Sequence, residues 1–228
     1  MLECLVDGEI SERISAMDRG LHYGDGLFET MAVIQGTPRF WQGHVDRLTT
    51  GCEQLGLPMT PQAVLLREVQ TVSTGQRRCV VKIIVTRGTS GRGYAATKPA
   101  RSNRIVCSWP WPQDPGDLVE TGIRMRICTL RLGIQPVLAG LKHLNRLEQV
   151  MARAEWEDRT IHEGLLLDAE DYVVSAISSN LFLVSGGRLL TPRLDRCGVR
   201  GVMRSSILNA FRERCEQRRI TLDMLPEA

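Results

Sequence analysis

The pattern of apolar and polar residues in the first part of the chain predicts two helices, with strands before and after them in the sequence. Residues 2–6 and 27–34 have the pattern of strands, and each run is followed by turn-forming residues. Apolar side chains recur at helical spacing over 41–55, and Gly56 predicts the end of this helix. Thr60-Pro61 is a good helix start, so we expect a second helix through Val72.

A nearly continuous apolar run at 79–86 predicts a central strand that is covered on both faces. A second strand at 104–109 returns from the loop that follows. Residues 110–116 contain three prolines and a glycine, which sustain neither a helix nor a strand, so we predict a linker there. The expected organisation is an N-terminal lobe at 1–112 and a C-terminal lobe at 113–228.

The second half predicts short strands with few helices. A helix is expected from Leu144, along one face formed by Leu147, Met151 and Ala154, to about Asp158. The other expected elements are strands at 123–130, 180–184, 188–191 and 220–222, a hairpin at 163–168 and 172–177, and a helix from 201 to about 215. The predicted class is therefore α+β, with two lobes and mixed sheets.

Composition excludes several classes of protein. The chain has 228 residues, 43% of them hydrophobic and 24% charged, with a net charge of +3, which is typical of a soluble globular protein. No basic stripe predicts a nucleic-acid partner, no run is long enough for a membrane span, and the N-terminus has no signal-peptide pattern. Seven scattered cysteines without a C-x-x-C pair predict reduced thiols and a cytoplasmic location. The four histidines show no metal-ligand spacing, so no metal site is expected.

Arginine greatly outnumbers lysine in this chain. Of the 29 Lys and Arg residues, only Lys82, Lys98 and Lys142 are lysines. Lys142 lies in the stretch 138–149, at a predicted strand-to-helix junction. A lysine amine can deprotonate and form a Schiff base, whereas a guanidinium stays charged. From position alone, a Schiff-base lysine and an ordinary solvated lysine are equally good interpretations.

Three further features could bind anions. The loop Arg87–Tyr94 holds Arg87 and Arg92 among glycines and favours capture of a carboxylate over a merely flexible hairpin. A helix start at 201–203 could present free N–H groups, although a plain helix start is the default interpretation. Arg47, one helical turn from His44, could reach the same anion or be a surface residue. Together with an amine nucleophile, these features suggest pyridoxal phosphate, an aldehyde with a phosphate handle.

Several motifs resemble the fold-type IV pyridoxal-phosphate enzymes, the family of the D-amino-acid and branched-chain aminotransferases. Within that family the resemblance is closest to the aminodeoxychorismate lyases. It covers essentially the whole chain in matching order and is most specific at 138–149. The motifs are Asp18–Gly20, Tyr23–Thr30, His44–Leu48, Arg87–Tyr94, Leu138–Gln149, Thr191–Asp195 and Gly201–Arg204.

The resemblance implies a two-lobed homodimeric enzyme that makes 4-aminobenzoate and pyruvate for folate synthesis. Lys142 would form the Schiff base with the cofactor and then act as the base that removes a substrate proton. The resemblance places further cofactor contacts at Arg47, Ser175, Ser179, Asn180, Val202 and Met203, and substrate contacts at Phe28, Arg92 and Tyr94. Arg47 and the amides of Val202 and Met203 would hold the phosphate.

Two departures from the family pattern support alternatives. Ser175 stands where the family has a glutamate that keeps the cofactor's ring nitrogen protonated, and a serine offers only a neutral hydrogen bond. An elimination that forms an aromatic ring should tolerate this change better than transamination, because aromatisation supplies driving force and transamination depends on full delocalisation of a carbanion. Family members also continue beyond the position of Ala228, so we expect a shortened C-terminal part. The alternatives are an aminotransferase of the same family and a catalytically impaired homologue.

Overall fold

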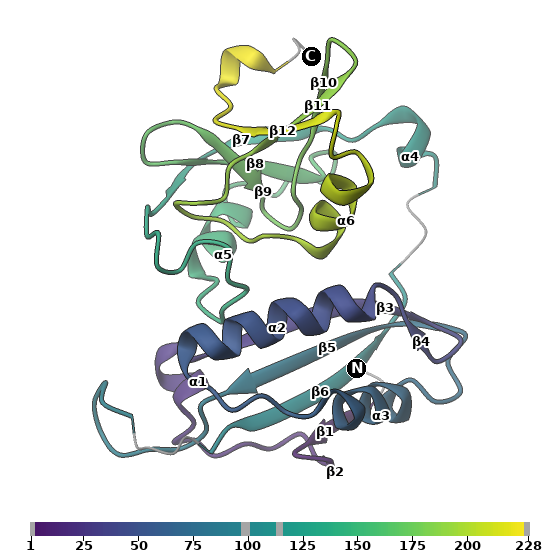
Figure 1. The fold of residues 1–228 in the computed structure, drawn as a ribbon, viewed down its shortest axis with the longest axis vertical. Helices are drawn as coiled ribbons and strands as arrows, with labels where there is room; N and C mark the ends of the chain where they lie inside the picture. Colours follow the sequence, from purple (N-terminus) through teal and green to yellow (C-terminus); the bar gives the residue numbers. More distant parts are fainter. Residues whose placement is uncertain (1–2, 97–100, 113–115, 226–228) are drawn as a thin grey trace. The chain divides into compact units, whose positions relative to one another are not determined.

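The computed structural model describes residues 3–96, 101–112 and 116–225. Two compact units divide the chain (Figure 1). Unit 1 comprises Met1–Gln113 together with the short segment Lys142–Asn145, and unit 2 comprises Asp114–Leu141 and Arg146–Ala228. The chain therefore leaves unit 2 for four residues, at Lys142, and then returns to it.

Within the described residues, unit 1 is a six-stranded antiparallel sheet with two long helices (Figure 1). The strand order is β2-β1-β6-β5-β3-β4. The strands are β1 (Cys4–Val6), β2 (Glu9–Ile10), β3 (Gly26–Ile34), β4 (Thr37–Pro38), β5 (Arg78–Thr86) and β6 (Asn103–Pro110), and the helices are α1 (Arg19–Tyr23), α2 (Trp41–Leu55) and α3 (Gln62–Val72).

The core of unit 1 lies between the sheet and the helices α2 and α3. Apolar side chains of β3, β5 and β6 pack there against Leu48 and Cys52 of α2 and Leu65 and Val69 of α3. Each fully buried aliphatic side chain of this kind contributes about 1.5–3 kcal/mol. The predicted helices and the central strand are confirmed, and Gly56 ends α2 with a φ of 63°.

The side chains of β3 and β5 that alternate away from this core form the outer face of the sheet. Val81, Ile83 and Val85 of β5 are buried in the core, so Lys82 and Ile84 point to the other face. Phe28 stands opposite Ile84 in the register, and Lys82 stands one pair further along, opposite Thr30. Phe28 and Lys82 are therefore diagonal neighbours on the outer face.

Unit 2 holds two three-stranded sheets in its described part (Figure 1). One has the order β7-β8-β9 and the other β10-β11-β12. The strands are β7 (Met125–Leu132), β8 (Glu163–Asp168), β9 (Val173–Ala176), β10 (Leu183–Ser185), β11 (Arg188–Pro192) and β12 (Cys215–Arg218), and the helices are α4 (Leu118–Thr121), α5 (Leu147–Arg153), α6 (Val202–Ala210) and the 3-10 turn Leu222–Met224.

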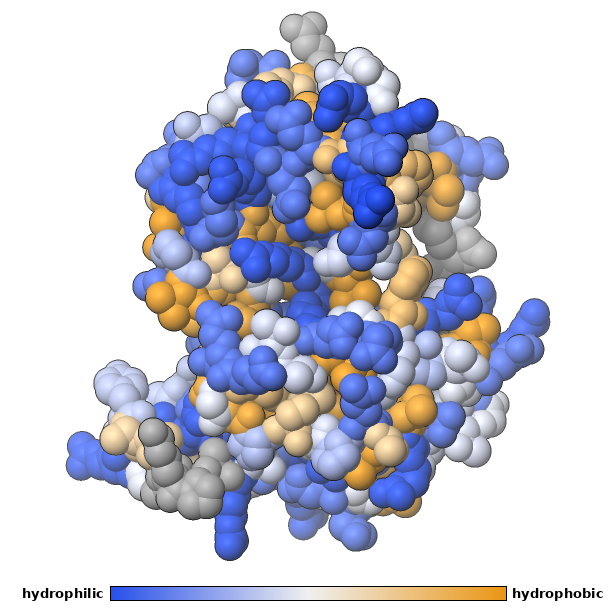
Figure 2. Space-filling model, viewed as in Figure 1, coloured by the Kyte–Doolittle hydropathy of each residue, from blue (hydrophilic) through white to orange (hydrophobic). Residues whose placement is uncertain are grey.

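The hairpin β8–β9 is confirmed, but the helices of unit 2 differ from their predictions. Helix α5 begins only at Leu147, because Leu144 belongs to unit 1, and its predicted apolar face is exposed at Leu147 and Met151. Apolar surface is visible in the region of α5 in Figure 2. The helix expected to reach about 215 ends at Ala210, since Cys215–Arg218 pairs with β11 as a strand.

The short helix α1 begins after Asp18, which caps it by accepting a hydrogen bond from the Gly20 N–H at 2.7 Å. One expectation for unit 1 is wrong. Cys4 and Cys107 form a disulfide, although all cysteines were expected to be reduced. These two residues face each other in the β1–β6 register, which the spacing of cysteines along the chain does not reveal. Part of the expected linker, 113–115, lies outside the described residues.

Candidate functional site

Lys142 lies against the start of β3. Its carbonyl oxygen accepts a hydrogen bond from the Phe28 N–H at 2.9 Å, and Leu144 donates to the Gly26 carbonyl at 3.0 Å. These bonds make the segment Lys142–Asn145 a short antiparallel neighbour of β3, centred on the bridge between Leu27 and His143. The Lys142 ammonium lies 4.3 Å from the centre of the Phe28 ring. The backbone thus fixes the half-buried amine over an aromatic side chain.

A buried carboxylate organises the helix α2 beside β3. Glu29 is 1% exposed and accepts from Arg47 at both oxygens, from Nε at 2.7 Å and from Nη2 at 2.5 Å. His44 Nδ1 donates to the same carboxylate at 2.6 Å. Burial alone would raise the pKa of Glu29, but the hydrogen bonds and charges of Arg47 and His44 outweigh burial and lower it. Glu29 is therefore ionised, and it fixes the orientation of Arg47.

The glycine-rich loop after β5 is held by Arg19. Its guanidinium donates to the carbonyls of Gly93 at 2.8 Å and Tyr94 at 2.9 Å, and to the Ser90 hydroxyl at 3.1 Å. Arg19 is buried, and Asp25 accepts from its Nε at 2.8 Å. The loop is therefore tied to α1 through two of its backbone carbonyls and one of its hydroxyls.

The two arginines of this loop have different environments. Arg87 donates to Asp25 at 2.8 Å and to the Leu55 carbonyl at 2.7 Å, so the carboxylate that it binds is one of the protein's own. Arg92 is exposed and Tyr94 is 87% exposed. Their predicted substrate contacts remain predictions.

In unit 2, Asn180 shapes the start of α6. Its side chain accepts from the Gly201 N–H at 3.0 Å and donates to the Val199 carbonyl at 2.9 Å. A side chain at Gly201 would collide with Asn180, so the glycine permits this close approach. Gly201 caps α6 without a side-chain hydrogen bond, and the first N–H groups of the helix, at Val202 and Met203, have no partner within the helix. This geometry suits an anion.

Arg204 connects the same helix to the sheet β10-β11-β12. It is buried and donates to the Pro192 carbonyl and the Gln217 side chain, both at 2.9 Å, and to the Thr191 hydroxyl at 3.3 Å. These partners lie on β11 and β12, so the first turn of α6 is fixed to the sheet. The start of α6 is consequently rigidly supported by two polar side chains, Asn180 and Arg204.

Ser175 is buried on β9, and its hydroxyl donates to the Ala176 carbonyl at 2.8 Å. To any other group it therefore presents only lone pairs. Glu170, at the hairpin tip, is paired with Arg196 and is no substitute for the family glutamate. Ser179 is exposed, and its carbonyl accepts from the Ala176 N–H at 2.9 Å.

The sequence model of the family described as amino-transferase class IV matches residues 26–228. The chain belongs to this family.

The chain is similar to members with more than one activity. It is 45% identical to a crystal structure of 4-amino-4-deoxychorismate lyase from Pseudomonas aeruginosa, with a TM-score of 0.92, covering 96% of this chain and 82% of that one. An aminodeoxychorismate lyase from Vibrio harveyi is 32% identical, over 89% of this chain and 75% of its own length. A putative branched-chain-amino-acid aminotransferase from Methanocaldococcus jannaschii is 28% identical, over 90% and 72%.

Class IV aminotransferases depend on pyridoxal phosphate. The residues described above fit this group chemically. Lys142 offers a half-buried amine to an aldehyde, and the start of α6 offers unpaired N–H donors to a phosphate. The described residues contain no group of three His, Cys, Asp or Glu side chains that could hold a metal ion. None of their helices is long and apolar enough to cross a membrane.

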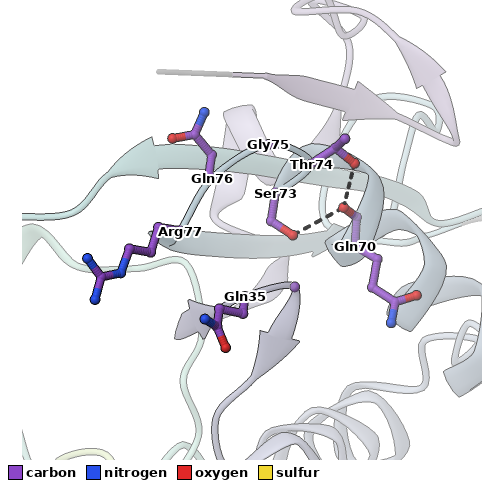
Figure 3. A pocket seen from close by; sticks show the side chains of 8 residues that line it. Gln35, Gln70, Ser73, Thr74, Gly75, Gln76 and Arg77 are labelled. Atoms are coloured by element: carbon purple, nitrogen blue, oxygen red, sulfur yellow. Dashed lines mark hydrogen bonds between the residues drawn. The ribbon is translucent and has the colours of Figure 1, made fainter.

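A polar pocket elsewhere in unit 1 does not belong to this chemistry (Figure 3). It lies between the β3–β4 turn and the end of α3, and it is lined by turn residues and side-chain amides. The hydroxyls of Ser73 and Thr74 both donate to the Gln70 carbonyl at 3.1 Å, so they are occupied in holding the helix end. We assign no class IV aminotransferase function to this pocket.

Sequence reasoning overlooked Glu29, Asp25 and Arg19 as organisers of the site. One pattern could have revealed Glu29, since it occupies an inward position of a strand whose other inward residues are apolar. A buried carboxylate needs a partner, and His44 and Arg47 of α2 provide it. No comparable pattern distinguishes Arg19 from the other arginines.

Proposed function

We propose that this protein is a pyridoxal-phosphate-dependent lyase that converts 4-amino-4-deoxychorismate to 4-aminobenzoate and pyruvate. The observation that carries the proposal is the 45% identity to a lyase of this kind over 96% of the chain. The fixed amine of Lys142 supports it, because the reaction needs both a covalent attachment point and a base.

Lys142 attaches the cofactor through Nζ. The charge of Arg47 and the N–H groups of Val202 and Met203 bind its phosphate, and Ser179 and Asn180 support that end of the site. Ser175 accepts at the ring nitrogen. When bound, pyridoxal phosphate draws electrons away from the substrate carbon that bears the amine.

The Lys142 amine, once exchanged for the substrate amine, takes the proton from the ring carbon that carries nitrogen. The bond between the neighbouring ring carbon and the enolpyruvyl oxygen then breaks, and the ring becomes aromatic. The departing enolpyruvate takes up a proton and becomes pyruvate. Phe28 packs against the Lys142 ammonium and excludes water from it, while Arg92 and Tyr94 contact the substrate.

Ser175 favours a lyase over the alternative of an aminotransferase. The Ser175 hydroxyl donates to the Ala176 carbonyl and can only accept a neutral hydrogen bond at the ring nitrogen. It lacks the negative charge of a carboxylate, so it holds the proton of that nitrogen less strongly and provides a weaker electron sink. Aromatisation drives elimination forward, whereas transamination gains nothing comparable. The similarity to a putative branched-chain-amino-acid aminotransferase keeps this alternative in the test.

The test is an absorbance spectrum of the purified protein with added pyridoxal phosphate, followed by product analysis. We expect visible absorbance of the lysine-bound cofactor, its loss in Lys142→Ala, and release of 4-aminobenzoate from the substrate. Cofactor binding with amino-group exchange between amino and keto acids, and no 4-aminobenzoate, would establish the aminotransferase instead. Absence of visible absorbance would identify a catalytically impaired homologue.

The proposed reaction carries further expectations. We propose a homodimer in the cytoplasm that supplies 4-aminobenzoate for folate synthesis, in keeping with the family resemblance. Sedimentation velocity of the purified protein tests the dimer, which predicts a particle of twice the 25.5 kDa chain mass.

A further inference from the structure

Two adjacent residues, Asp18 and Arg19, hold different parts of the loop Arg87–Tyr94. Asp18 is fully buried, and its carboxylate accepts hydrogen bonds from the Thr86 hydroxyl at 2.8 Å and from the Asn103 side-chain amide at 2.6 Å. Thr86 is the last residue of β5 and Asn103 the first of β6, and the two face each other in the register. Asp18 therefore closes the base of the connection between these strands.

Arg19 holds the loop further from the sheet. Its guanidinium donates to the Ser90 hydroxyl and to the carbonyls of Gly93 and Tyr94, and its backbone N–H donates to the Gly88 carbonyl at 2.9 Å. The loop contains three glycines, which would give it many backbone conformations without these bonds. Arg19 therefore selects one conformation of an intrinsically flexible segment.

Gly20 permits this pair to lie so close to the sheet. A Cβ atom at Gly20 would lie 2.4 Å from Thr86 Cγ2 and 2.8 Å from Asp18 Oδ1, so any side chain there would push α1 away from β5. The three consecutive residues Asp18, Arg19 and Gly20 thus fix α1 to the end of β5, to the start of β6 and to the loop between them.

We propose that Asp18 and Arg19 are positioning residues that hold the loop Arg87–Tyr94 in the conformation that binds the substrate. The inference rests on the proposed function, in which Arg92 and Tyr94 contact the substrate. Arg92 lies within the part of the loop that Arg19 holds, so its backbone is fixed while its side chain is exposed. A loop that is ordered beforehand loses less conformational entropy when a substrate binds.

The test uses Arg19→Lys, because lysine keeps a positive charge beside Asp25 but lacks the guanidinium fork that reaches three loop acceptors at once. The matched control is Arg104→Lys, which changes another arginine of unit 1 that pairs with a carboxylate, that of Glu68 at 2.6 Å. Ser90→Ala is a milder variant that removes one loop acceptor and leaves Arg19 in place. It carries the test if Arg19→Lys does not fold.

Limited digestion with trypsin measures the loop directly. Trypsin cleaves after arginine, and the bond between Arg92 and Gly93 lies beside the carbonyls that Arg19 holds. Its cleavage requires the loop to open, so the rate follows the population of the open loop. From the loss of charge-assisted bonds we expect cleavage after Arg92 to be about tenfold to a hundredfold faster in Arg19→Lys. The increase should be smaller in Ser90→Ala, and Arg104→Lys should match wild type.

Kinetics of the cofactor-loaded protein measure the consequence for the substrate. KM for 4-amino-4-deoxychorismate should rise about tenfold in Arg19→Lys, because only a fraction of the protein then has the binding conformation of the loop. The value of kcat and the visible absorbance should stay close to those of wild type. Asp18→Asn, which replaces one acceptor oxygen by an NH2 group, should change KM in the same direction.

Unchanged cleavage after Arg92 in both Arg19→Lys and Ser90→Ala overturns the proposal. Faster cleavage with an unchanged KM also overturns it, because the loop conformation would then be irrelevant to the substrate. A lower kcat with an unchanged KM does so as well, since Arg19 would then act on the reacting groups. If wild type releases no 4-aminobenzoate, the lyase proposal fails, and the digestion still decides whether Arg19 positions the loop.

Discussion

Replacement of Glu29 by glutamine tests whether one buried carboxylate both stabilises unit 1 and prepares Arg47 for an anion. The carboxylate accepts three hydrogen bonds, two from Arg47 and one from His44, at 2.5–2.7 Å. Glutamine keeps one oxygen as an acceptor, but its NH2 group faces Arg47 or His44, which are themselves donors. Glu29→Gln therefore loses at least one charge-assisted bond and leaves the guanidinium without its counter-ion.

The magnitude follows from burial. A hydrogen bond to a charged group contributes about 1.5–3 kcal/mol, and breaking a buried ion pair costs about 3–5 kcal/mol. The Arg47 side chain is 15% exposed, so water recovers part of this loss. We expect Glu29→Gln to lower the free energy of unfolding by about 3 kcal/mol, a large share of the roughly 5–15 kcal/mol typical of a protein.

Urea unfolding followed by tryptophan fluorescence measures this loss, since Trp41, Trp109 and Trp111 all lie in unit 1. The matched control is Glu68→Gln, which breaks the bidentate pair of Glu68 with Arg104, at 2.6 and 2.7 Å, in the same unit. Both variants should lose stability.

Titration with pyridoxal phosphate separates the two variants. Glu29→Gln should bind it about tenfold more weakly, the effect of about 1.4 kcal/mol, because Arg47 loses its orientation. Glu68→Gln should bind it as wild type does. An unfolding free energy for Glu29→Gln within about 1 kcal/mol of wild type would refute the reasoning, because the expected loss is about 3 kcal/mol.

Two further predictions concern acid and the phosphate site. Glu29 and Asp25 have lowered pKa values in the folded state, so their stabilisation is complete above their ordinary pKa values of 4.5 and 3.8 and is lost as pH falls through the lower folded values. The urea concentration at the unfolding midpoint should therefore decrease as the pH is lowered below about 4.5. The decrease with pH should be less steep in Glu29→Gln than in wild type, and equal slopes for the two proteins would contradict this prediction. Asn180→Ala removes the bonds that shape the start of α6, so affinity for pyridoxal phosphate should drop about tenfold in a fluorescence titration. Unchanged affinity would show that Asn180 does not support the phosphate site.

Periodicity predicted those elements whose buried face leaves a regular apolar pattern in the sequence. Helix α2 and its glycine end, the central strand β5 and the hairpin β8–β9 all follow from spacing, because burial on one or both faces leaves a regular apolar pattern. Helix α5 was misjudged for the same reason. Leu144 has the correct spacing for its face, but a tertiary pairing with Gly26 removes it from the helix.

The roles of individual charges were the least predictable part of the site. Arg87 and Arg92 look alike in a glycine-rich loop, yet Asp25 accepts from Arg87 and not from Arg92. This pairing joins residues 62 positions apart, so it depends on the fold and leaves no local pattern. Lys142 could be singled out because the chain contains so few lysines, and its motif added the family resemblance.

The four-residue segment Lys142–Asn145 has a consequence for protein engineering and for gene recombination. A polypeptide that stops at Gln113 would contain all six strands of unit 1 but would lack the residues that border β3 and carry the amine proposed to bind the cofactor. Exchange of either unit between homologues at a single crossover would therefore pair the β3 edge of one parent with the lysine segment of the other. We expect functional chimeras of this protein to need residues from the same parent at Gly26–Phe28 and Lys142–Leu144, because these two segments pair with each other.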